Sequence, residues 1–516
     1  MHPQSSCMLM APRPEMRITP TGGQPSNDSF PYFNLAWVGE GVIVVVGWPG
    51  RWAIHFGRDK ETGLRVRAGQ ELTHLRLHPG EQVRTPLIVL QFWEGDRIRA
   101  QNIWRRWMLA HNVPRPGGKL PPPLFNASSS RYFNVMSKAD EASQKLFIDR
   151  YLEEGLQIDY WWMDAGWYPC DGRWQTTGTW EVDTKRFPQG LRAITDYAHS
   201  KGVKCIVWFD PERVTPGTWL YENHPEWLLG PADASLKVLN LGNPEAWQWV
   251  TNHIDKLITE EGIDLYRQDF NLDPLTYWRA NDAEDRQGIT EIRHVTGYLA
   301  FWDELRRRHP DMLIDTCAGG GRRNDLETLR RAVPLHRSDH MFEPVSQQCQ
   351  TYGLASWVPF YGAPTVSDEL YVVRSTMCPT FSSRWDVRRK DLDYELLRRL
   401  ADQWRAIAPY FLGDYYPLTS YSCEGDVWMV WQFDRPDLGE GVVQIFRRAE
   451  SVYESARFKL RGLDPEAHYV LTDFDVPGAT RLTGRKLMQE GLHVVMADKP
   501  SATVITYKQV SLPGEK

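Results

Sequence analysis

The sequence predicts an α/β protein in which a (β/α)8 TIM barrel is flanked by an N-terminal β module and a C-terminal antiparallel β-sandwich. The chain has 516 residues, and one hydrophobic core stops growing at roughly 250 to 300 residues, so two or three domains are expected. From Phe125 to about Leu412, short apolar strands alternate with helical stretches, which is typical of a parallel sheet wound with helices. Short strands bounded by turn residues occupy the rest of the chain.

The N-terminal module is expected over residues 1–115. Its strand-like segments are 34–39, 41–50, 52–57, 64–69, 72–81 and 84–93. They fit a small sandwich or part of a larger one, and whether the N-terminus is complete stays open. A helix is expected around 97–111. The proline- and glycine-rich segment 114–125 has the composition of an interdomain linker.

The barrel is expected over residues 120–412. Its predicted strands are 124–135, 159–166, 203–212, 264–270, 312–321, 334–339, 354–362 and 380–385, and its clearest helices are 142–155, 190–202, 244–262 and 296–310. The helices begin after Asp, Asn or Pro and end at Gly or His-Pro, as capped helices do. Residues 413–516 form the predicted sandwich, with strands at 426–434, 441–448, 456–463, 468–475, 492–498 and 502–509.

The composition favours a small, neutral binding partner. The net charge is −6 without a run of like charges, so we expect neither nucleic acid nor membrane as a partner. The chain has 23 Trp, 21 Tyr and 19 Phe, and such rings suit the apolar faces of sugars as well as a protein core. No segment has the length of a signal peptide core or of a membrane span, so we expect a cytoplasmic protein.

The cysteines indicate neither a disulfide framework nor a metal site. Seven are present, widely separated and without zinc-type spacing: Cys7, Cys170, Cys205, Cys317, Cys349, Cys378 and Cys423. An odd number without pairing motifs predicts free thiols, and we expect no metal and no cofactor.

Acidic residues follow five consecutive predicted barrel strands. In order, they are Asp164, Asp210 with Glu212, Asp269, Asp315 with Cys317 after it, and Asp339. Each alone can be explained as a helix cap. Because the active site of a barrel lies at the C-terminal ends of its strands, the five together indicate carboxylate chemistry. Carboxylates without histidine partners, among many Trp, fit cleavage of a glycosidic bond.

Five segments in the same order resemble glycoside hydrolase family 36, the melibiase-type α-galactosidases. They are Trp208-Phe209-Asp210-Pro211-Glu212, His224-Pro225-Glu226-Trp227, Arg267-Gln268-Asp269-Phe270-Asn271, Cys317-Ala318-Gly319-Gly320-Gly321 and Arg337-Ser338-Asp339. The resemblance covers about Phe125 to Asp339. It implies a retaining α-glycosidase that forms a covalent glycosyl–Asp intermediate, with Asp269 as nucleophile and Asp339 as acid/base. It also implies a homo-oligomer, because family members commonly assemble.

The resemblance and the strand ends together predict the sugar contacts. The expected substrate-binding residues are Asp164, Trp167, Trp208, Asp210, Arg267, Asn271, Cys317, Gly319, Gly320, Arg322 and Arg337. Trp162 is a further candidate sugar platform. Arg267 is expected to lower the pKa of Asp269, whereas Asp339, as an acid, should lie in a drier or more negative environment.

Four positions depart from the family pattern. Ala165 replaces the second of two adjacent aspartates, and Gln268, Thr179 and Arg322 replace other motif residues. We expect them where the hydroxyls of the sugar are recognised, so they affect the preferred sugar more than the reaction. The alternatives to an α-galactoside are an α-N-acetylgalactosaminide and a deoxy sugar or one lacking the 6-hydroxyl. A transglycosylase and a catalytically silent sugar-binding protein are further alternatives.

Overall fold

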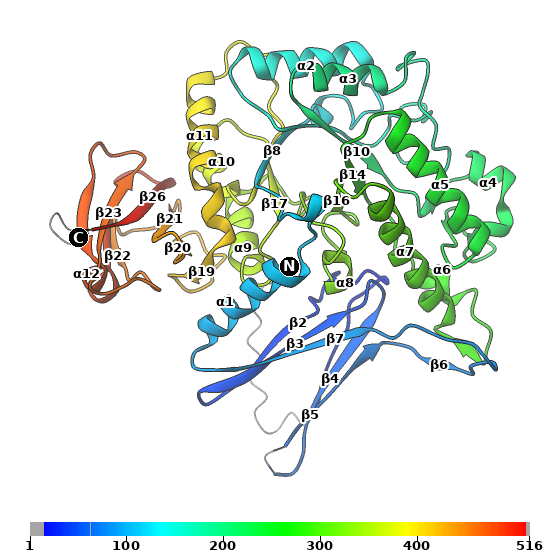
Figure 1. The fold of residues 1–516 in the computed structure, drawn as a ribbon, viewed down its shortest axis with the longest axis horizontal. Helices are drawn as coiled ribbons and strands as arrows, with labels where there is room; N and C mark the ends of the chain where they lie inside the picture. Colours follow the sequence, from blue (N-terminus) through cyan, green and yellow to red (C-terminus); the bar gives the residue numbers. More distant parts are fainter. Residues whose placement is uncertain (1–14, 62, 512–516) are drawn as a thin grey trace.

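The computed structural model describes residues 15–61 and 63–511. Figure 1 shows the barrel in cyan, green and yellow, with the blue N-terminal sheets below it and the orange and red C-terminal sandwich beside it. The two β parts therefore contact different sides of the barrel.

Seven parallel strands form one curled sheet in the spatial order β16-β14-β10-β9-β8-β18-β17. They are β8 (Leu124–Ala127), β9 (Tyr160–Met163), β10 (Lys204–Phe209), β14 (Leu265–Gln268), β16 (Leu313–Thr316), β17 (Gly362–Thr365) and β18 (Thr380–Ser383). A short extended segment closes the ring between β16 and β17. Val333 bridges to Asp315 on one side, and the Gly362 nitrogen donates to the Pro334 carbonyl on the other, at 2.9 Å. This confirms the predicted (β/α)8 barrel.

A helix follows each of the eight strands. They are α2 (Glu141–Glu153), α3 (Arg192–Ser200), α5 (Pro244–Glu260), α7 (Ile289–Arg308), α8 (Leu326–Leu329), α9 (Pro344–Leu354), α10 (Leu370–Thr376) and α11 (Tyr394–Ile407). Side chains of Asp140, Asn243 and Asp393 accept hydrogen bonds from first-turn N–H groups, which explains why these helices begin where they do.

The loops of the barrel carry further short elements. They are η3 (Ser130–Tyr132), β11 (Arg213–Val214), α4 (Trp219–Asn223), η4 (Pro225–Trp227), β12 (Leu228–Leu229), β13 (Lys237–Leu239), α6 (Leu275–Arg279), β15 (Arg286–Gln287) and η5 (Ala408–Leu412).

The predicted seventh strand is wrong in its bounds. Residues 354–361 end α9 and continue as a loop, and only Gly362 of the predicted segment belongs to β17. Val358, Phe360 and Tyr361 are buried. A short apolar run that fills a core looks the same in a strand as in a buried loop, so periodicity could not separate them. The eighth strand lies within its predicted range.

The barrel strands have two apolar faces. Trp162, Ile206, Leu265 and Leu313 belong to one interior cluster. Their sequence neighbours, such as Trp161 and Tyr266, belong to the large cluster between strands and helices. Because side chains alternate along a strand, this division fixes which residues at the strand ends face the interior.

The N-terminal part contains two three-stranded antiparallel sheets, β1-β4-β5 and β2-β3-β7. Its elements are β1 (Glu15–Ile18), β2 (Tyr32–Trp37), β3 (Glu40–Gly47), β4 (Trp52–Arg58), β5 (Leu64–Gln70), β6 (His74–Leu75), β7 (Leu87–Glu94), α1 (Arg97–Trp107), η1 (Met108–Asn112) and η2 (Pro116–Gly118). The predicted strand at 72–81 is only the two-residue β6. It pairs with β15 of the barrel. Because β15 is itself only two residues long, it cannot pair with a longer strand.

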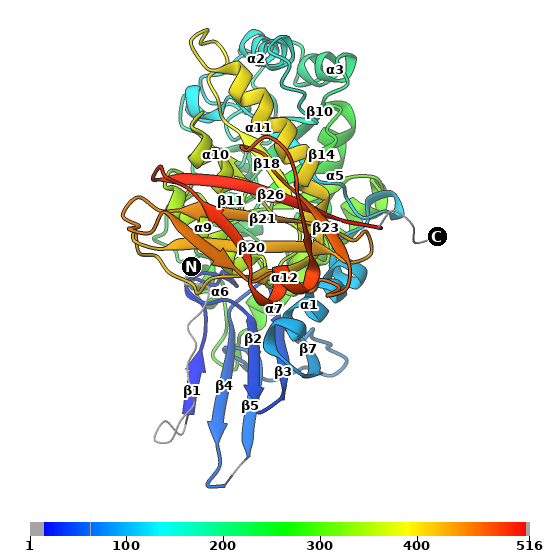
Figure 2. The ribbon, with the colours of Figure 1, turned by 90° about the vertical axis from the view of Figure 1, so that its left-hand side faces the viewer.

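The C-terminal part contains a six-stranded antiparallel sheet, β19-β20-β21-β26-β23-β24, and the pair β22–β25. Its elements are β19 (Asp414–Pro417), β20 (Trp428–Arg435), β21 (Glu440–Arg447), β22 (Ser455–Phe458), β23 (His468–Asp473), β24 (Thr480–Thr483), α12 (Gly484–Gln489), β25 (Leu492–Val495) and β26 (Ser501–Val510). Figure 2 shows this sheet face-on in front of the barrel. Arg374 of α10 joins the two parts through Asp475, with Nη2 to Oδ1 at 2.7 Å. The predicted C-terminal sandwich is confirmed.

Two observations concern the described ranges alone. No helix in residues 15–61 and 63–511 is long and apolar enough to cross a membrane. The six cysteines from Cys170 to Cys423 are free thiols, and Cys7 lies outside the described residues.

Candidate active site

A ring of polar side chains lies on the inner face of the barrel, at the C-terminal ends of its strands. Leu265 faces the interior, so Arg267 and Asp269, two and four residues later, face it too. Cα pairing aligns Trp208, Arg267 and Asp315 across three neighbouring strands. The same alternation places these residues in the ring: Asp164, Asp210, Asp269, Cys317 and Arg384.

Asp269 is fixed by three N–H donors. Its Oδ1 accepts from the backbone nitrogens of Gly319 and Phe270, both at 2.8 Å. Its Oδ2 accepts from Trp208 Nε1 at 3.2 Å. The residue is 7% exposed, so the carboxylate is held in one orientation at the edge of the interior.

Asp339 follows the short closing segment of the barrel and lies beside the same glycine turn. Its side chain is 65% exposed. A Cβ built on Gly320 would lie 2.8 Å from Asp339 Oδ2 and 2.8 Å from the Asp339 backbone nitrogen. Asp269 accepts from Gly319, and Asp339 contacts Gly320. The two predicted carboxylates are therefore brought together at consecutive glycines.

We expect Gly320→Ala to lower activity by roughly 100-fold, because the new methyl group displaces the Asp339 carboxylate and small misplacements of catalytic groups cost about that much. Gly320 also has a φ of +84°, which disfavours alanine. Steady-state kinetics of the purified variant measures the effect.

The matched control for this variant is Gly217→Ala. Gly217 has a φ of +78° with nothing within 4 Å of the added methyl group. The Gly217→Ala variant therefore has the same unfavourable backbone conformation for alanine, but its methyl group makes no new contact. Equal losses in the two variants would show that backbone strain, and not displacement of Asp339, lowers activity.

The environment of Asp339 differs from the one expected for an acid. His336 Nε2 lies 2.9 Å from Oδ1, and this hydrogen bond, rather than burial, dominates and lowers the pKa of Asp339. The expectation of a drier or more negative environment is therefore wrong. The physical reason is that the carboxylate lies at the open rim, where only His336 contacts it strongly.

Arg267 pairs with a different carboxylate from the one expected. Its Nη1 donates to Asp315, and its guanidinium lies 4.3 Å from the centroid of the Trp162 ring. Arg267 is 3% exposed. The nearest counter-charge of Arg267 is thus Asp315 on the neighbouring strand β16, and not Asp269.

The predicted sugar platforms are largely core residues. Trp167 is fully buried, donates its Nε1 to the Trp208 carbonyl at 2.8 Å and packs against Phe209. It lies on the helix side of the strands, so the structure does not place it in the ring, and its role as a substrate contact stays a prediction. Trp162 is 1% exposed and lies between two arginines. Trp208 is also buried, but its Nε1 contacts Asp269.

Arg337 does not face the interior either. Its Nη1 donates to Thr351 Oγ1 at 2.7 Å and its Nη2 to the Gln347 carbonyl at 2.9 Å, both on α9. The structure therefore does not bring Arg337 into the ring, and its role as a substrate contact stays a prediction. Arg337 anchors α9 beside the loop that carries Asp339.

Three of the four departures from the motif pattern lie away from the interior. Ala165 belongs to the cluster between strands and helices. Gln268 accepts from Trp302 Nε1 at 2.6 Å on the helix side. Thr179 Oγ1 accepts from the Trp219 nitrogen at the start of α4. Gln268 and Ala165 are thus turned toward the helices, whereas Thr179 belongs to a loop beside α4, and the role of these positions in recognising hydroxyls stays a prediction. Arg322 lies at the glycine turn and pairs with Asp273 at 2.7 Å.

Asp210 and Asp164 are the other carboxylates of the ring. Asp210 Oδ2 accepts from the Asn271 backbone at 3.1 Å and from its Nδ2 at 3.2 Å. Burial raises the pKa of Asp210 to about 6; Arg213 opposes the shift and the charge of Asp269 adds to it. Burial also raises the pKa of Asp164. Cys317 is 1% exposed, and its Sγ accepts from the Gly320 nitrogen.

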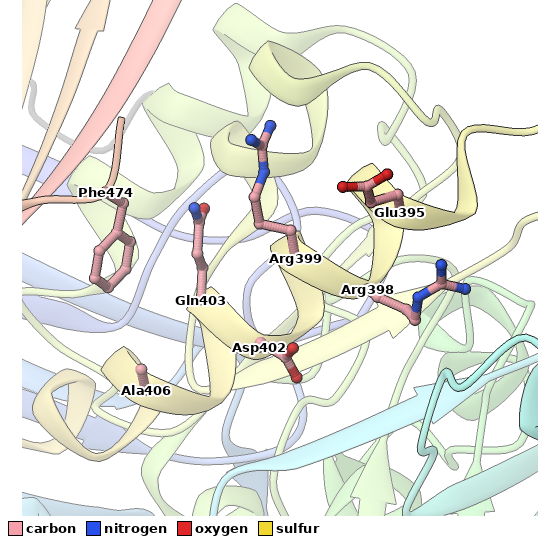
Figure 3. Close-up of a pocket in the computed structure, with 7 residues that line it drawn as sticks. All are labelled: Glu395, Arg398, Arg399, Asp402, Gln403, Ala406 and Phe474. Atoms are coloured by element: carbon pink, nitrogen blue, oxygen red, sulfur yellow. The ribbon is translucent and has the colours of Figure 1, made fainter. Parts of the chain in front are cut away.

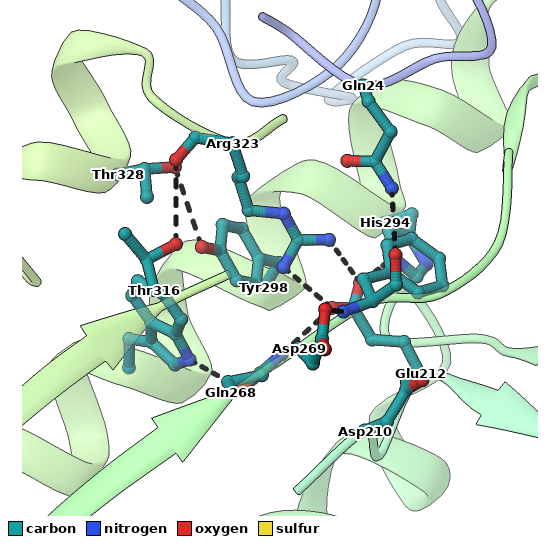
Figure 4. A network of polar contacts seen from close by, with 12 residues as sticks. Gln24, Asp210, Glu212, Gln268, Asp269, His294, Tyr298, Thr316, Arg323 and Thr328 are labelled. Carbon is teal, nitrogen blue, oxygen red and sulfur yellow. Dashed lines mark hydrogen bonds and ion pairs between the residues drawn. The ribbon is translucent and has the colours of Figure 1, made fainter. Parts of the chain in front are cut away.

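Glu212 belongs to a polar network beside Asp210 and Asp269, as Figure 4 shows. It accepts from Arg323 Nη1 at 2.8 Å and from Gln268 Nε2 at 2.8 Å, and His294 Nε2 lies 2.8 Å away. Burial alone would raise the pKa of Glu212, but Arg323 and His294 lower it to about 2.

Because that pKa lies below its ordinary value of 4.5, Glu212 stabilises the folded state above pH 4.5 and loses this effect as the pH falls toward 2. We expect Glu212→Gln to cost about 3 kcal/mol at neutral pH, since it leaves Arg323 buried without a counter-charge. Thermal unfolding of variant and wild type at pH 7 and at steps from pH 4.5 down to pH 2.5 measures the difference, which should shrink over the acidic steps. Glu284→Gln, at an exposed glutamate, is the control. A difference that does not change with pH would contradict this role.

Two groups at the site lie outside the motifs identified in the sequence. Arg384 follows β18, and a charged residue directly after a barrel strand was a signal for it. The second group is an N-terminal segment: Ser26 Oγ donates to the Gly321 carbonyl at 3.1 Å and Gln24 Nε2 to the Leu272 carbonyl at 3.0 Å. These contacts join positions that are 295 and 248 residues apart in sequence, so no local pattern could predict them.

An open pocket of about 480 Å³ lies elsewhere, between α11 and Phe474 of the C-terminal part (Figure 3). Its lining includes Arg399 and Gln403 and none of the predicted site residues. It is separate from the ring of carboxylates.

Two family models match the chain. The Melibiase model matches residues 115–362, and the model of the Glycosyl hydrolase family 36 C-terminal domain matches residues 428–510.

Curated relatives are similar over most of the chain. The alpha-galactosidase Mel36A of Lactobacillus acidophilus is 25% identical over 461 residues, which cover 84% of this chain and 61% of the relative. Alpha-galactosidase 1 of Pediococcus pentosaceus is 25% identical over 472 residues, covering 86% and 62%. The chain thus spans about three fifths of the length of these relatives.

Solved structures share the fold. The alpha-galactosidase from Lactobacillus brevis superposes with a TM-score of 0.86 at 18% identity, covering 97% of this chain and 71% of that one. A variant of the alpha-galactosidase AgaA from Geobacillus stearothermophilus, in complex with stachyose, gives 0.86 at 19% identity, covering 96% and 72%. At these identities the likeness concerns the fold alone.

Proposed function

This chain belongs to the melibiase-type glycosyl hydrolases of family 36, and on that premise we propose that it is a retaining α-glycosidase that hydrolyses terminal α-linked sugars. An α-galactoside is the first candidate substrate, since the similar curated proteins are named alpha-galactosidases. The observation that carries the proposal is the meeting of Asp269 and Asp339 at Gly319 and Gly320.

In this proposal Asp269 attacks the anomeric carbon while Asp339 protonates the leaving oxygen. A glycosyl–Asp269 ester forms, and the aglycone departs. Asp339, now ionised, takes a proton from water, which attacks the same carbon and releases Asp269. The sugar leaves with the anomeric configuration of the substrate. Such a pair of carboxyl groups works at a separation of roughly 5 to 5.5 Å.

Two features of the surroundings support this division, although His336 lowers the pKa of Asp339. Asp269 is held by three N–H donors, which suits a nucleophile that must present one oxygen to the sugar. Asp339 lies at the exposed rim, with His336 beside it. An acid/base must exchange protons with water in every cycle, and the rim provides that access.

Contacts of the sugar are proposed from the ring itself. Asp164, Asp210, Asn271 and Arg322 remain candidates, together with the backbone of the glycine turn. Buried carboxylates and amides that read hydroxyl groups discriminate strongly between sugars. Asp210 Oδ1 is buried without a hydrogen-bond partner, so a sugar hydroxyl would supply the one it lacks.

A panel of 4-nitrophenyl α-glycosides tests the proposed function. We expect release of nitrophenol from the α-galactoside or from another α-glycoside of the panel. Proton NMR of the reaction should show the α-anomer of the free sugar before mutarotation. Initial formation of the β-anomer would contradict a retaining mechanism, and lack of turnover across the panel would contradict hydrolysis.

Three further expectations stay predictions. They are the division of the chain at 1–115, 120–412 and 413–516, the homo-oligomer and the cytoplasmic location.

A further inference from the structure

Arg384 is a positively charged member of the interior ring, as Arg267 is, but it lies directly after the end of its strand. It directly follows β18, and its backbone nitrogen donates to the Thr365 carbonyl at 2.9 Å. The residue is 4% exposed. Sequence motifs did not single it out, and the mechanism above does not use it.

Half of the Arg384 guanidinium is held by the protein. Nη1 donates to Ser382 Oγ at 2.8 Å, to the Ser383 carbonyl at 3.0 Å and, more weakly, to Asn126 Oδ1 at 3.4 Å. The Arg384 Cζ atom lies 4.5 Å from the centroid of the Trp162 ring, and the Arg267 Cζ atom lies 4.3 Å from the same centroid. These contacts fix the position of the group.

The other edge of the guanidinium has no protein acceptor. Within residues 15–61 and 63–511, every hydrogen bond of the Arg384 side chain comes from Nη1. Nε of Arg267 is fully buried and has no hydrogen-bond partner. Nε and Nη2 of Arg384 also have no partner, but they are not fully buried. They therefore keep access to solvent. Nε and Nη2 form the edge that binds the two oxygens of a carboxylate side by side.

The charge of Arg384 also lacks a close counter-ion. Arg267 forms an ion pair with Asp315, whereas Arg384 has no carboxylate within 4.0 Å in the described part of the chain. Burial lowers its pKa to about 10, although the more distant Asp164 raises it. A buried cation without a close partner is costly, and an anion placed on its free edge removes that cost.

We propose that Arg384 determines substrate specificity by binding an anionic substituent of the sugar, so that the substrate is an α-linked hexuronic acid rather than a neutral hexose. The proposal rests on the glycosidase function proposed above and names its substrate class. A neutral hydroxyl could accept one hydrogen bond from this edge, but it would leave the charge uncompensated.

Three aryl glycosides of equal shape test the proposal: 4-nitrophenyl α-D-galacturonide, its methyl ester and the α-D-galactoside. We expect wild-type kcat/KM for the uronide to exceed that for its ester by about 100-fold, since loss of one partner of a buried charged pair has an effect of that order. Arg384→Met should lose about 100-fold on the uronide and change the other two by less than about tenfold.

Arg384→Lys and Arg389→Met are the matched variants. Lysine keeps the charge but cannot donate two parallel hydrogen bonds to a carboxylate, so we expect an intermediate loss of kcat/KM on the uronide. Arg389 is exposed and pairs with Asp391, so its substitution should leave all three substrates unchanged. A uronide no better than its ester, or equal losses on all three substrates in Arg384→Met, would overturn the proposal.

Calorimetric binding of methyl α-D-galacturonide and methyl α-D-galactoside separates this inference from the proposed function. If no glycoside is turned over, the hydrolase proposal fails. Preferential binding of the uronide that Arg384→Met abolishes would still support the inference, and binding without preference would overturn it. Thermal unfolding shows whether Arg384→Met is folded; if it is not, Arg384→Lys decides the outcome.

Discussion

Replacing Asp269 with glycine is expected to lower kcat on aryl α-glycosides by about 10⁴-fold or more, and sodium azide should restore part of the activity. The loss follows from removing the group that forms the covalent bond. Azide restores turnover because it fits the space left by the side chain and attacks the anomeric carbon from the same side. The product of rescue is then the β-glycosyl azide, which NMR and mass spectrometry identify.

Asp269→Asn is the control for this variant. The amide keeps the size of the carboxylate and its contact region beside Gly319 and Trp208, so it should be folded and inactive and should resist rescue by azide. Asp269→Gly that retains wild-type turnover would exclude Asp269 as the nucleophile. Rescue that gives the α-azide would place azide on the wrong side of the sugar.

Replacing Asp339 with alanine should harm poor leaving groups far more than good ones. For a glycoside with an alkyl or sugar aglycone, we expect a loss of about 10³- to 10⁴-fold, because its oxygen must be protonated as the bond breaks. For a 2,4-dinitrophenyl glycoside the first step needs no proton, and we expect that step to slow by less than about tenfold. Pre-steady-state release of the phenol measures the first step alone.

The exposure of Asp339 makes this variant easy to interpret. Its side chain is 65% exposed and contacts His336, so alanine leaves no buried cavity, and a large stability effect is not expected. Equal losses on good and poor leaving groups would contradict the acid/base assignment. His336 would then be the neighbouring group to test.

The sequence was sufficient to predict the barrel because the fold depends on repeated local patterns. Each strand is a short apolar run followed by a polar residue, and the helices have caps such as Asp140 and Asn243. The bounds of the seventh strand were predicted wrongly. Its residues Gly362–Thr365 lack the β-branched run that identifies a strand, whereas the preceding residues are more apolar.

The inward direction of the carboxylates could be predicted for a similar reason, and the direction of several other candidate site residues could not. Asp164, Asp210 and Asp269 end regular strands, where alternation decides which side chains face inward. Gln268 and Ala165 are one residue out of phase with them and point toward the helices. Arg337 belongs to an irregular closing segment, so its direction depended on α9, which the sequence did not link to it.

Residues that act over long sequence separations were also beyond prediction. Asn126, near the start of the barrel, accepts from Arg384 near its end. The Gly319 turn is supported by Ser26 from the N-terminal part. Such pairs follow from closure of the barrel and from docking of a second domain, and neither leaves a local pattern.

The most direct test of the two-carboxylate account is mass spectrometry of a trapped glycosyl-enzyme. A fluorinated glycosyl fluoride of the sugar that the panel selects should form the ester faster than the ester is hydrolysed. The ring fluorine slows both steps, because both have oxocarbenium-like transition states, and the good fluoride leaving group offsets this in the first step alone. We expect one added sugar per chain, and fragmentation of the peptic peptide should place it on Asp269. A sugar found on another residue, or an active protein that is inhibited without any covalent label, would contradict the account.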